Sequence, residues 1–353
     1  MSELLQQTIA MIHPLDEEAM GKVRLRQHQL TKPRGSLGRL EELSVRIAGI
    51  TGKVMPNIEQ KAIVIMAGDH GVIAEGVSAY PQEVTAQMVY NFLRGGACIN
   101  VFTRHIGARV VVVNTGVAAR LEPHSSLISR KIASGTGNMA KEPAMTREQA
   151  LRAIVGGIEV VNDEVTKGLD IVGVGDMGIG NTTPSSAICA AVTGEPVAKV
   201  TGRGAGISDE QLALKVRVIE TALTLNKPDP KDTIDILSKV GGFEIGGIAG
   251  VILGATAQRI PVVIDGFITG AAALIAYGLC PRVKDYLIAA HVSAEAGHKV
   301  VLDYLGLKPL LDLEMCLGEG TGAALVISIV EAAIKALVEM ATFADAGISE
   351  KVE

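Results

Sequence analysis

The fold is decided by residues 170–184, which have the sequence DIVGVGDMGIGNTTP. The apolar run Asp170–Val174 predicts a buried strand, and the glycine-rich turn after it leads into a helix predicted over Pro184–Val192. We expect Thr183 to cap this helix, with Pro184 at its first position. Free N–H groups at the start of a helix attract anions, so the segment predicts a phosphate site; a tight turn without a ligand is the alternative.

The rest of the chain repeats this alternation of short apolar runs and helical stretches. Strands are predicted at Ala62–Met66, Arg109–Val113 and Pro261–Ile264. Helices are predicted at Pro81–Leu93, Thr146–Lys167, Ser208–Leu225, Gly266–Pro281 and Ala323–Ala341. Ser208 with Gln211, and Thr146 with Gln149, fit capping boxes. The alternation predicts an α/β fold in which a parallel sheet is covered by helices on both faces.

The two ends of the chain differ from its middle. Residues up to about Gln29, and those from about Gly322 onward, predict helices without strands. We therefore expect an α/β domain over residues 30–322 and a small helical domain that residues 1–29 and 323–353 build together. Ligand sites in open α/β sheets lie beyond the carboxyl ends of the strands, so the loops that follow the predicted strands matter most.

Composition argues against several classes of function. The 353 residues include 33 Lys and Arg against 38 Asp and Glu, a net charge of −5 without a basic block, so nucleic-acid binding is not expected. Aromatic residues make up only 3%, which argues against a base-stacking platform. The four cysteines are far apart, no signal peptide pattern is seen, and the apolar stretch Gly266–Pro281 is shorter than the about 20 residues that span a membrane. We expect a cytoplasmic protein with reduced thiols.

Two segments match nucleotide-binding motifs only in part. Gly173, Gly175 and Gly178 fit the dinucleotide fingerprint, but the residues before Glu195, where a second strand is required, predict a helix. A dinucleotide-dependent oxidoreductase that uses Gly173–Gly178 is kept as the alternative function. Residues 262–270 look like the loop by which type I phosphoribosyltransferases hold pyrophosphoryl-ribose. That loop usually has two adjacent acids and this chain has only Asp265, so an acid that faces a helix start is the alternative.

Other polar residues lie in or beside the glycine-rich loops. Asp69 and His70, together with His291, His298 or Asp265, suggest a metal site, but their spacing favours hydrogen-bonded histidines near a site and no metal. Glu319 stands between glycines. Apolar surroundings would raise its pKa and make it a base near neutral pH, whereas the alternative is an acid stabilised by the dipole of the following helix.

Lys215 lies on the helix predicted over Ser208–Leu225, where a lysine is usually solvated. The glycine-rich turn Gly202–Gly206 precedes this helix and offers a second set of N–H donors for a phosphate. Lys215 is therefore a candidate phosphate ligand because of its neighbours in the sequence.

Five segments together carry a specific resemblance. They are residues 32–40 (KPRGSLGRL), 69–71 (DHG), 175–184 (GDMGIGNTTP), 237–243 (LSKVGGF) and 317–324 (LGEGTGAA). In this order they make the chain, from about Leu4 to Ala341, similar to the nicotinate-nucleotide:5,6-dimethylbenzimidazole phosphoribosyltransferases of cobalamin lower-ligand assembly. The resemblance implies a homodimer with a Rossmann-like parallel sheet and a small helical domain from both termini. It also implies transfer of phosphoribose from nicotinate mononucleotide to 5,6-dimethylbenzimidazole, giving α-ribazole 5′-phosphate and nicotinate, without a cofactor.

The resemblance also implies roles for single residues. Glu319 matches the family's catalytic glutamate, the base that takes the N–H proton of the benzimidazole, and Asp176 falls where other members have a glutamate. The phosphate-holding region is matched by Gly178, Gly180, Asn181, Thr182, Gly202, Gly204 and Lys215. The wall that binds the benzimidazole ring is matched by Tyr80, Met88 and Leu317. Methionine at 88, where some relatives have glutamine, is an adaptable side chain that we expect to broaden the range of accepted bases. A homologue that only binds the nucleotide is disfavoured, because Glu319 is intact.

Overall fold

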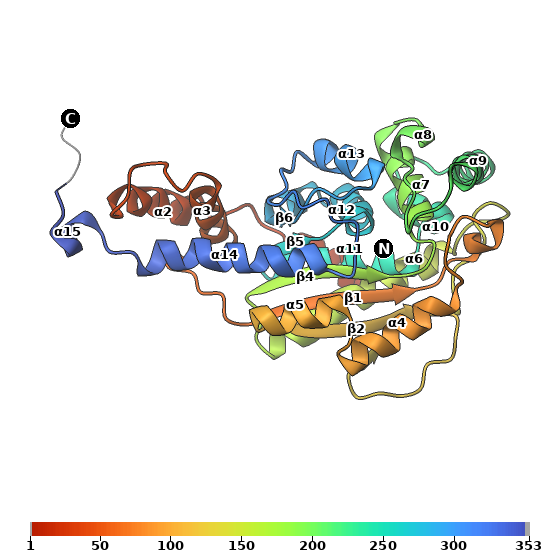
Figure 1. The fold of residues 1–353 in the computed structure, drawn as a ribbon, viewed down its shortest axis with the longest axis horizontal. Coiled ribbons are helices and arrows are strands. Elements are labelled where there is room, and N and C mark those ends of the chain that lie inside the picture. Colours follow the sequence, from red (N-terminus) through yellow and green to blue (C-terminus); the bar gives the residue numbers. More distant parts are fainter. Residues whose placement is uncertain (1, 350–353) are drawn as a thin grey trace.

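A computed structural model describes residues 2–349 and has a six-stranded parallel sheet at its centre (Figure 1). The strands are β1 (Lys61–Gly68), β2 (Arg109–Gly116), β3 (Leu127–Ser129), β4 (Ile171–Met177), β5 (Val262–Ile264) and β6 (Leu287–Ala289). Their order in the sheet is β3-β2-β1-β4-β5-β6, which is the order of the doubly wound Rossmann fold. The predicted α/β class is therefore confirmed.

Helices cover both faces of the sheet. On one face α11 (Phe243–Ala257) and α12 (Phe267–Leu279) contact the strands. The core on this face also includes residues of α1 (Glu3–Ala10), α6 (Arg147–Thr166), α7 (Thr182–Thr193), α9 (Asp209–Asn226), α10 (Thr233–Val240) and α13 (Ala296–Leu305). The other face packs against α3 (Arg39–Thr51), α4 (Glu83–Arg94), α5 (Cys98–Ile106) and α14 (Thr321–Glu339). The short elements are the helices α8 (Val197–Val200) and α15 (Phe343–Ala346) and the 3₁₀ turns η1 (Gly71–Glu75) and η2 (Pro281–Tyr286).

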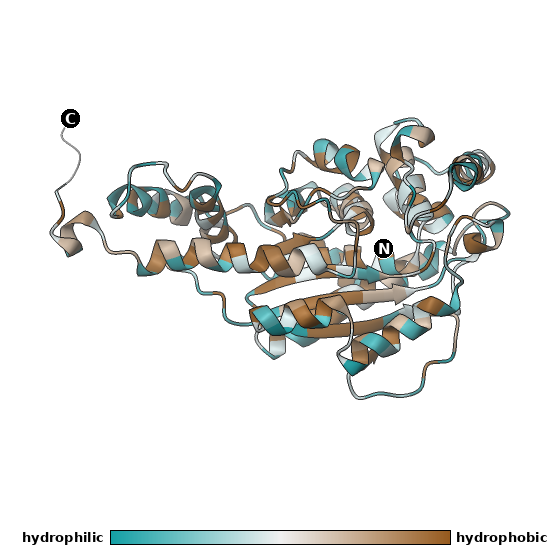
Figure 2. Ribbon diagram, in the orientation of Figure 1, coloured by the Kyte–Doolittle hydropathy of each residue, from teal (hydrophilic) through white to brown (hydrophobic). Residues whose placement is uncertain are grey.

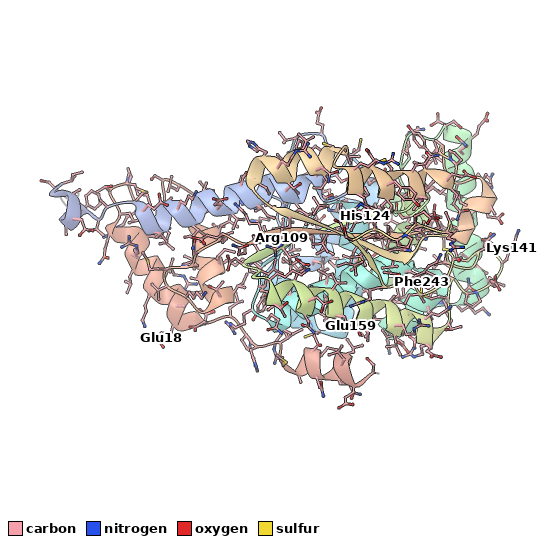
Figure 3. All side chains as sticks on the ribbon, turned by 90° about the horizontal axis from the view of Figure 1, so that it is seen from below. Glu18, Arg109, His124, Lys141, Glu159 and Phe243 are labelled. Carbon is pink, nitrogen blue, oxygen red and sulfur yellow. The ribbon has the colours of Figure 1, made fainter. Side chains whose placement is uncertain are left out.

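The central strands are buried on both faces because each face supports its own core. Along β1, Ile63 and Ile65 join the core beside α14, whereas Val64 and Met66 join the core beside α11. This alternation explains the continuous apolar run in the sequence, which is typical of parallel strands covered on both sides. Figure 2 shows the strands as largely hydrophobic, and Figure 3 places Phe243 in the interior, with Glu18 and Lys141 at the periphery.

An arm of helices projects beyond the amino ends of the strands (Figure 1). Helix α2 (Glu17–Gln29), helix α3 and the last turns of α14 share a small core of Ala19, Val23, Val45, Ala48 and Leu337. In Figure 1 this arm lies at the end of the molecule that carries α15, whereas α1 packs against α6 and α11 in the main body. The division into residues 30–322 and a domain of 1–29 with 323–353 stays a prediction.

Helix α14 differs from the other helices in its length and composition. Among residues 2–349 it is the one helix long and apolar enough to cross a membrane by those two measures. It packs against α3, α5, β4 and β5, and more than half of it is buried. The core that α14 forms accounts for its apolar sequence, because the central helix of a folded core passes the same test of length and hydropathy.

Several local expectations can be compared with the structure. The two capping boxes, at Thr146 with Gln149 and at Ser208 with Gln211, are confirmed. The cap predicted at Thr183 is wrong. Helix α7 begins at Thr182 with Asn181 as its N-cap, because the N–H of Ser185 already donates to the carbonyl of Asn181 at 3.1 Å.

Strands β3 and β6 were not among the predicted elements. Each has only three residues, the same length as the predicted strand β5, so their length alone does not explain why they were not predicted. Both lie at the edges of the sheet, so the four predicted strands form its centre.

Candidate active site

A cavity of about 680 Å³ lies at the carboxyl ends of β4, β5 and β6. Its lining comes from six segments that are separated in the sequence: residues 80–88, 176–182, 204–206, 266–268, 291–295 and 316–319. The position is the one expected for a ligand site in an open α/β sheet. A second cavity of about 510 Å³ lies between α2 and α3 and contains none of the candidate site residues.

Glu319 is held in a constrained position at the start of α14. Its φ is +65°, a left-handed conformation that side chains other than glycine rarely adopt. On the opposite side lies Gly175 of β4, where a Cβ would collide with the backbone carbonyl of Glu319. Such local strain persists only where the surroundings enforce it, and it is common at functional sites. The glycine in the strand therefore lets the Glu319 backbone approach the sheet.

The carboxyl group of Glu319 is buried and incompletely paired. The residue is 8% exposed, and its Oε2 finds no hydrogen-bond partner among the residues that the structure describes. Burial raises the pKa of Glu319 to about 7. A carboxyl group with this pKa is divided between its acid and base forms near neutrality, which is the condition for efficient proton transfer.

Asp265 fixes the segment that carries Glu319. Its carboxyl oxygens accept the N–H groups of Gly320, at 2.9 Å, and of Ala323, at 3.1 Å, so it caps the first turn of α14 from the end of β5. Burial raises the pKa of Asp265 to about 7. The alternative weighed for residues 262–270, an acid that faces a helix start, is confirmed.

Asp176 lies beside Glu319 at the end of β4. Its Oδ2 accepts the side-chain amide of Asn181 at 2.8 Å, and a Cβ on Gly318 would stand 3.2 Å from its Oδ1. Burial, and then the nearby Asp265, raise the pKa of Asp176 to about 7. The structure therefore gathers three carboxyl groups with raised pKa values around one end of the cavity.

Lys215 and the two glycine-rich turns meet on another side of the site. The Nζ atom of Lys215 donates to Thr182 Oγ1 at 2.7 Å and to the carbonyl of Gly202 at 3.2 Å. A Cβ on Gly204 would lie 3.0 Å from the same Thr182 hydroxyl. Lys215 is only 1% exposed, and burial lowers its pKa to about 8. Three segments that the sequence associates with phosphate are thus brought together.

The remaining predicted residues lie around the same cavity. Gly178 and Asn181 line it, and Gly180, with φ +88°, makes the turn between them. Tyr80, Met88 and Leu317 line its more open side, where Tyr80 is 51% and Leu317 44% exposed.

Sequence reasoning missed several residues of the site. Ser293 and Glu295 line the cavity from the segment after β6, beside His291, which the sequence suggested only as a metal ligand. Phe267 and Ile268 line it from the start of α12. His291 Nδ1 lies 3.6 Å from Asp265 Oδ1, and its pKa is lowered by burial. No motif marks Ser293 or Glu295. The only signal available was their position after a strand, and β6 itself was not predicted.

His70 belongs to a buried ion pair beneath the site. Its Nε2 lies 2.7 Å from Glu244 Oε1, and both side chains are almost fully buried. Burial alone would lower the pKa of His70, but the adjacent Glu244 carboxylate outweighs it and the pKa is raised. His298 Nδ1 accepts the N–H of Ser293 at 3.0 Å. Within residues 2–349, no three potential ligands gather where they could hold a metal ion.

The dinucleotide alternative is not supported. Gly173 and Gly175 lie inside β4, where a Cβ would collide with Ile63 and with the backbone of Glu319, respectively. They therefore serve packing within the sheet, whereas the fingerprint requires glycines at the turn between strand and helix.

Comparisons with known proteins agree with this geometry. The family model described as "Phosphoribosyltransferase" matches residues 12–348. A nicotinate-nucleotide--dimethylbenzimidazole phosphoribosyltransferase of Roseiflexus sp. (strain RS-1) is 61% identical over 99% of both chains. One of the same name from Dehalococcoides mccartyi (strain BAV1) is 59% identical, also over 99% of both.

The solved structures give the same picture. The crystal structure of CobT from Thermus thermophilus is 46% identical and superposes with a TM-score of 0.92, covering 95% of this chain and 100% of that one. The chain therefore belongs to the family of nicotinate-nucleotide--dimethylbenzimidazole phosphoribosyltransferases.

Proposed function

We propose that this protein transfers phosphoribose from nicotinate mononucleotide to 5,6-dimethylbenzimidazole, giving α-ribazole 5′-phosphate and nicotinate. The observation that carries the proposal is the buried carboxyl group of Glu319, which has a pKa of about 7 and whose Oε2 has no hydrogen-bond partner among the described residues. The same cavity is lined by Thr182, whose hydroxyl accepts a hydrogen bond from Lys215. One cavity thus holds a base for the benzimidazole and a region that binds the phosphate of the nucleotide.

Glu319 acts as the general base. The benzimidazole nitrogen that carries a lone pair attacks the anomeric carbon of the ribose, and the bond from that carbon to the pyridine nitrogen breaks. The electron pair of the broken bond stays on the pyridine nitrogen, so the cationic ring leaves neutral and needs no acid. The attacking ring would become cationic, and Glu319 takes its N–H proton. Such a base contributes about 10²–10⁴-fold to a rate.

The phosphate of the nucleotide lies at Lys215, Thr182 and the turn at Gly202 and Gly204, with Gly178, Gly180 and Asn181 at the start of α7. The support is the convergence of a buried ammonium, a hydroxyl and backbone N–H groups, which are the usual partners of a phosphate. No pyrophosphate leaves in this reaction, so a metal clamp is not required and the protein acts without a cofactor.

Asp176 faces the cationic pyridinium or the ribose, where a carboxyl group next to the reacting carbon would stabilise positive charge. Tyr80, Met88 and Leu317 form the wall for the benzimidazole ring. Met88 is flexible and apolar and widens the range of accepted bases. If exchange of Met88 for glutamine leaves the relative rates for dimethylbenzimidazole, adenine and a phenol unchanged, this role is wrong.

We further propose that the protein is a cytoplasmic homodimer that binds neither nucleic acid nor membranes, with residues 30–322 as the catalytic domain. The acidic charge balance and the widely spaced cysteines support this setting. Light scattering of the purified protein tests the dimer, because a mass of one chain would contradict it.

The reaction is tested by product analysis. Purified protein is mixed with nicotinate mononucleotide and dimethylbenzimidazole in the presence of a chelator, and α-ribazole phosphate is followed by chromatography and mass. We expect product from the wild type and a loss of about 10²-fold or more in Glu319→Gln. Glu314→Gln changes an exposed carboxylate of the same loop and is the matched control. Absence of product from the wild type would refute the proposal.

A further inference from the structure

We propose that Glu295 is an internal substitute for the phosphate of the substrate, so that its carboxylate occupies the phosphate-binding turn until a nucleotide displaces it. The inference deepens the proposed function and rests on it for the identity of the nucleotide. It assigns a specificity-determining role to a residue that carries no motif.

The carboxylate of Glu295 lies directly on the glycine-rich turn. Its Oε1 accepts the N–H of Gly204 at 2.8 Å. A Cβ on Gly202 would collide with its Oε2, so the turn can approach the carboxylate only because this residue is glycine. The carboxylate therefore already uses a backbone donor of the turn that would bind a phosphate.

The same carboxylate balances the buried lysine. Glu295 is the acid whose charge acts favourably on the ammonium group of Lys215, which donates to Thr182 Oγ1 at 2.7 Å. The carboxylate thus accepts a backbone N–H of the turn and acts electrostatically on Lys215, whose ammonium group, with the Thr182 hydroxyl, would contact a phosphate.

The charges around the turn favour a phosphate that replaces the Glu295 carboxylate over one that binds beside it. Among the described residues that line the cavity there is neither a lysine nor an arginine, and Lys215 lies just behind the lining. A phosphate placed next to Glu295 would be repelled by its carboxylate, and this repulsion would offset part of the attraction to Lys215. Once Glu295 has moved away, the phosphate meets the full charge of Lys215.

The position of Glu295 allows it to leave at low cost. Its Oε2 is buried and has no hydrogen-bond partner within residues 2–349, so its contact with the turn satisfies only part of its capacity. Glu295 is also the N-cap residue of α13, but its side chain makes no capping bond to that helix. A rotation of the side chain therefore leaves the start of α13 unchanged.

This arrangement would keep inorganic phosphate out of the site. Free phosphate offers only its own contacts in exchange for the bond between Glu295 and Gly204. Nicotinate mononucleotide adds the contacts of its ring and ribose, and that binding energy displaces the carboxylate.

The test is the affinity of Glu295→Gln and Glu295→Ala for two probes, inorganic phosphate and nicotinate mononucleotide, measured by calorimetry. We expect both variants to bind both probes more tightly, by about tenfold to a hundredfold, the equivalent of one hydrogen bond to a charged group. Nicotinate riboside, which lacks the phosphate, is expected to bind the variants and the wild type equally. The product also carries a phosphate, so its slower release should lower kcat in the variants.

Asp209→Asn is the matched control. It removes the same charge from an exposed acid that pairs with Arg203 of the same turn. Unchanged or weaker phosphate binding in both Glu295 variants would overturn the inference, since the carboxylate would then support the turn. The transferase proposal is judged separately by product formation, so tighter phosphate binding without any product from the wild type would reject the transferase and retain the role of Glu295.

Discussion

Exchange of Glu319 for glutamine is expected to stabilise the protein at alkaline pH while it abolishes the base. The carboxyl group is buried without a partner for Oε2 among the described residues, so its charged form is disfavoured by the fold. Glutamine has nearly the same shape and is never charged. The variant therefore removes the loss of folding free energy that the wild type suffers when Glu319 is ionised.

The size of the effect follows from the pKa. Burial raises the pKa of Glu319 from 4.5 to about 7, and such a change corresponds to at most about 3 kcal/mol of folding free energy. The folded state holds the proton more tightly than the unfolded state does. The contribution of Glu319 to stability is therefore fully present below pH 4.5, falls as the pH rises to about 7, and stays constant above that.

Urea unfolding at several pH values between about 5 and 8.5 measures the difference between wild type and variant. We expect the advantage of Glu319→Gln to be small at the acidic end and to grow to about 2–3 kcal/mol at the alkaline end, a shift of about 4 °C in Tm for a chain of this size. Glu314→Gln should show no such trend. A difference that does not change with pH would refute the explanation by burial.

Three further outcomes are expected. The value of kcat/KM for dimethylbenzimidazole should rise with pH to about 7, where Glu319 loses its proton, and then level off; a profile without this rise would argue against Glu319 as the base. Gly175→Ala should cost about 1–3 kcal/mol in urea unfolding and about a hundredfold in kcat, because its Cβ collides with the carbonyl of Glu319. Lys215→Met should raise KM for nicotinate mononucleotide about tenfold to a hundredfold in steady-state kinetics, by loss of a charged hydrogen-bond donor, and an effect on kcat alone would contradict this role.

The central architecture could be predicted because its signals are local. The strands around Ile63 and Val172 are continuous apolar runs, and the helix at Ser208 begins with a capping box that depends on residues three apart. The start of α7 could not be placed correctly, because the choice between Asn181 and Thr183 depends on which carbonyl accepts the first helical hydrogen bond.

The residues of the candidate site also differ in whether the sequence could predict them. Glu319 and Lys215 lie next to glycine-rich turns and could be singled out from the sequence, although the left-handed backbone of Glu319 could not. Glu295 could not be found, since its contact with Gly204 joins residues 91 positions apart. That contact depends on the path of the chain after β6, a strand that was not predicted from the sequence.

The position of α14 in the chain has a consequence for synthesis. β1 ends at Gly68 and α14 begins at Thr321, yet Ala323 and Ile327 of α14 pack beside Ile63 of β1 around Gly173. A ribosome needs on the order of 10–50 s to make the intervening residues, and one apolar face of the sheet lacks its central helix throughout that time. The nascent chain therefore exposes that apolar face until α14 has been made, and a fragment that ends before Glu319 lacks the base that we propose.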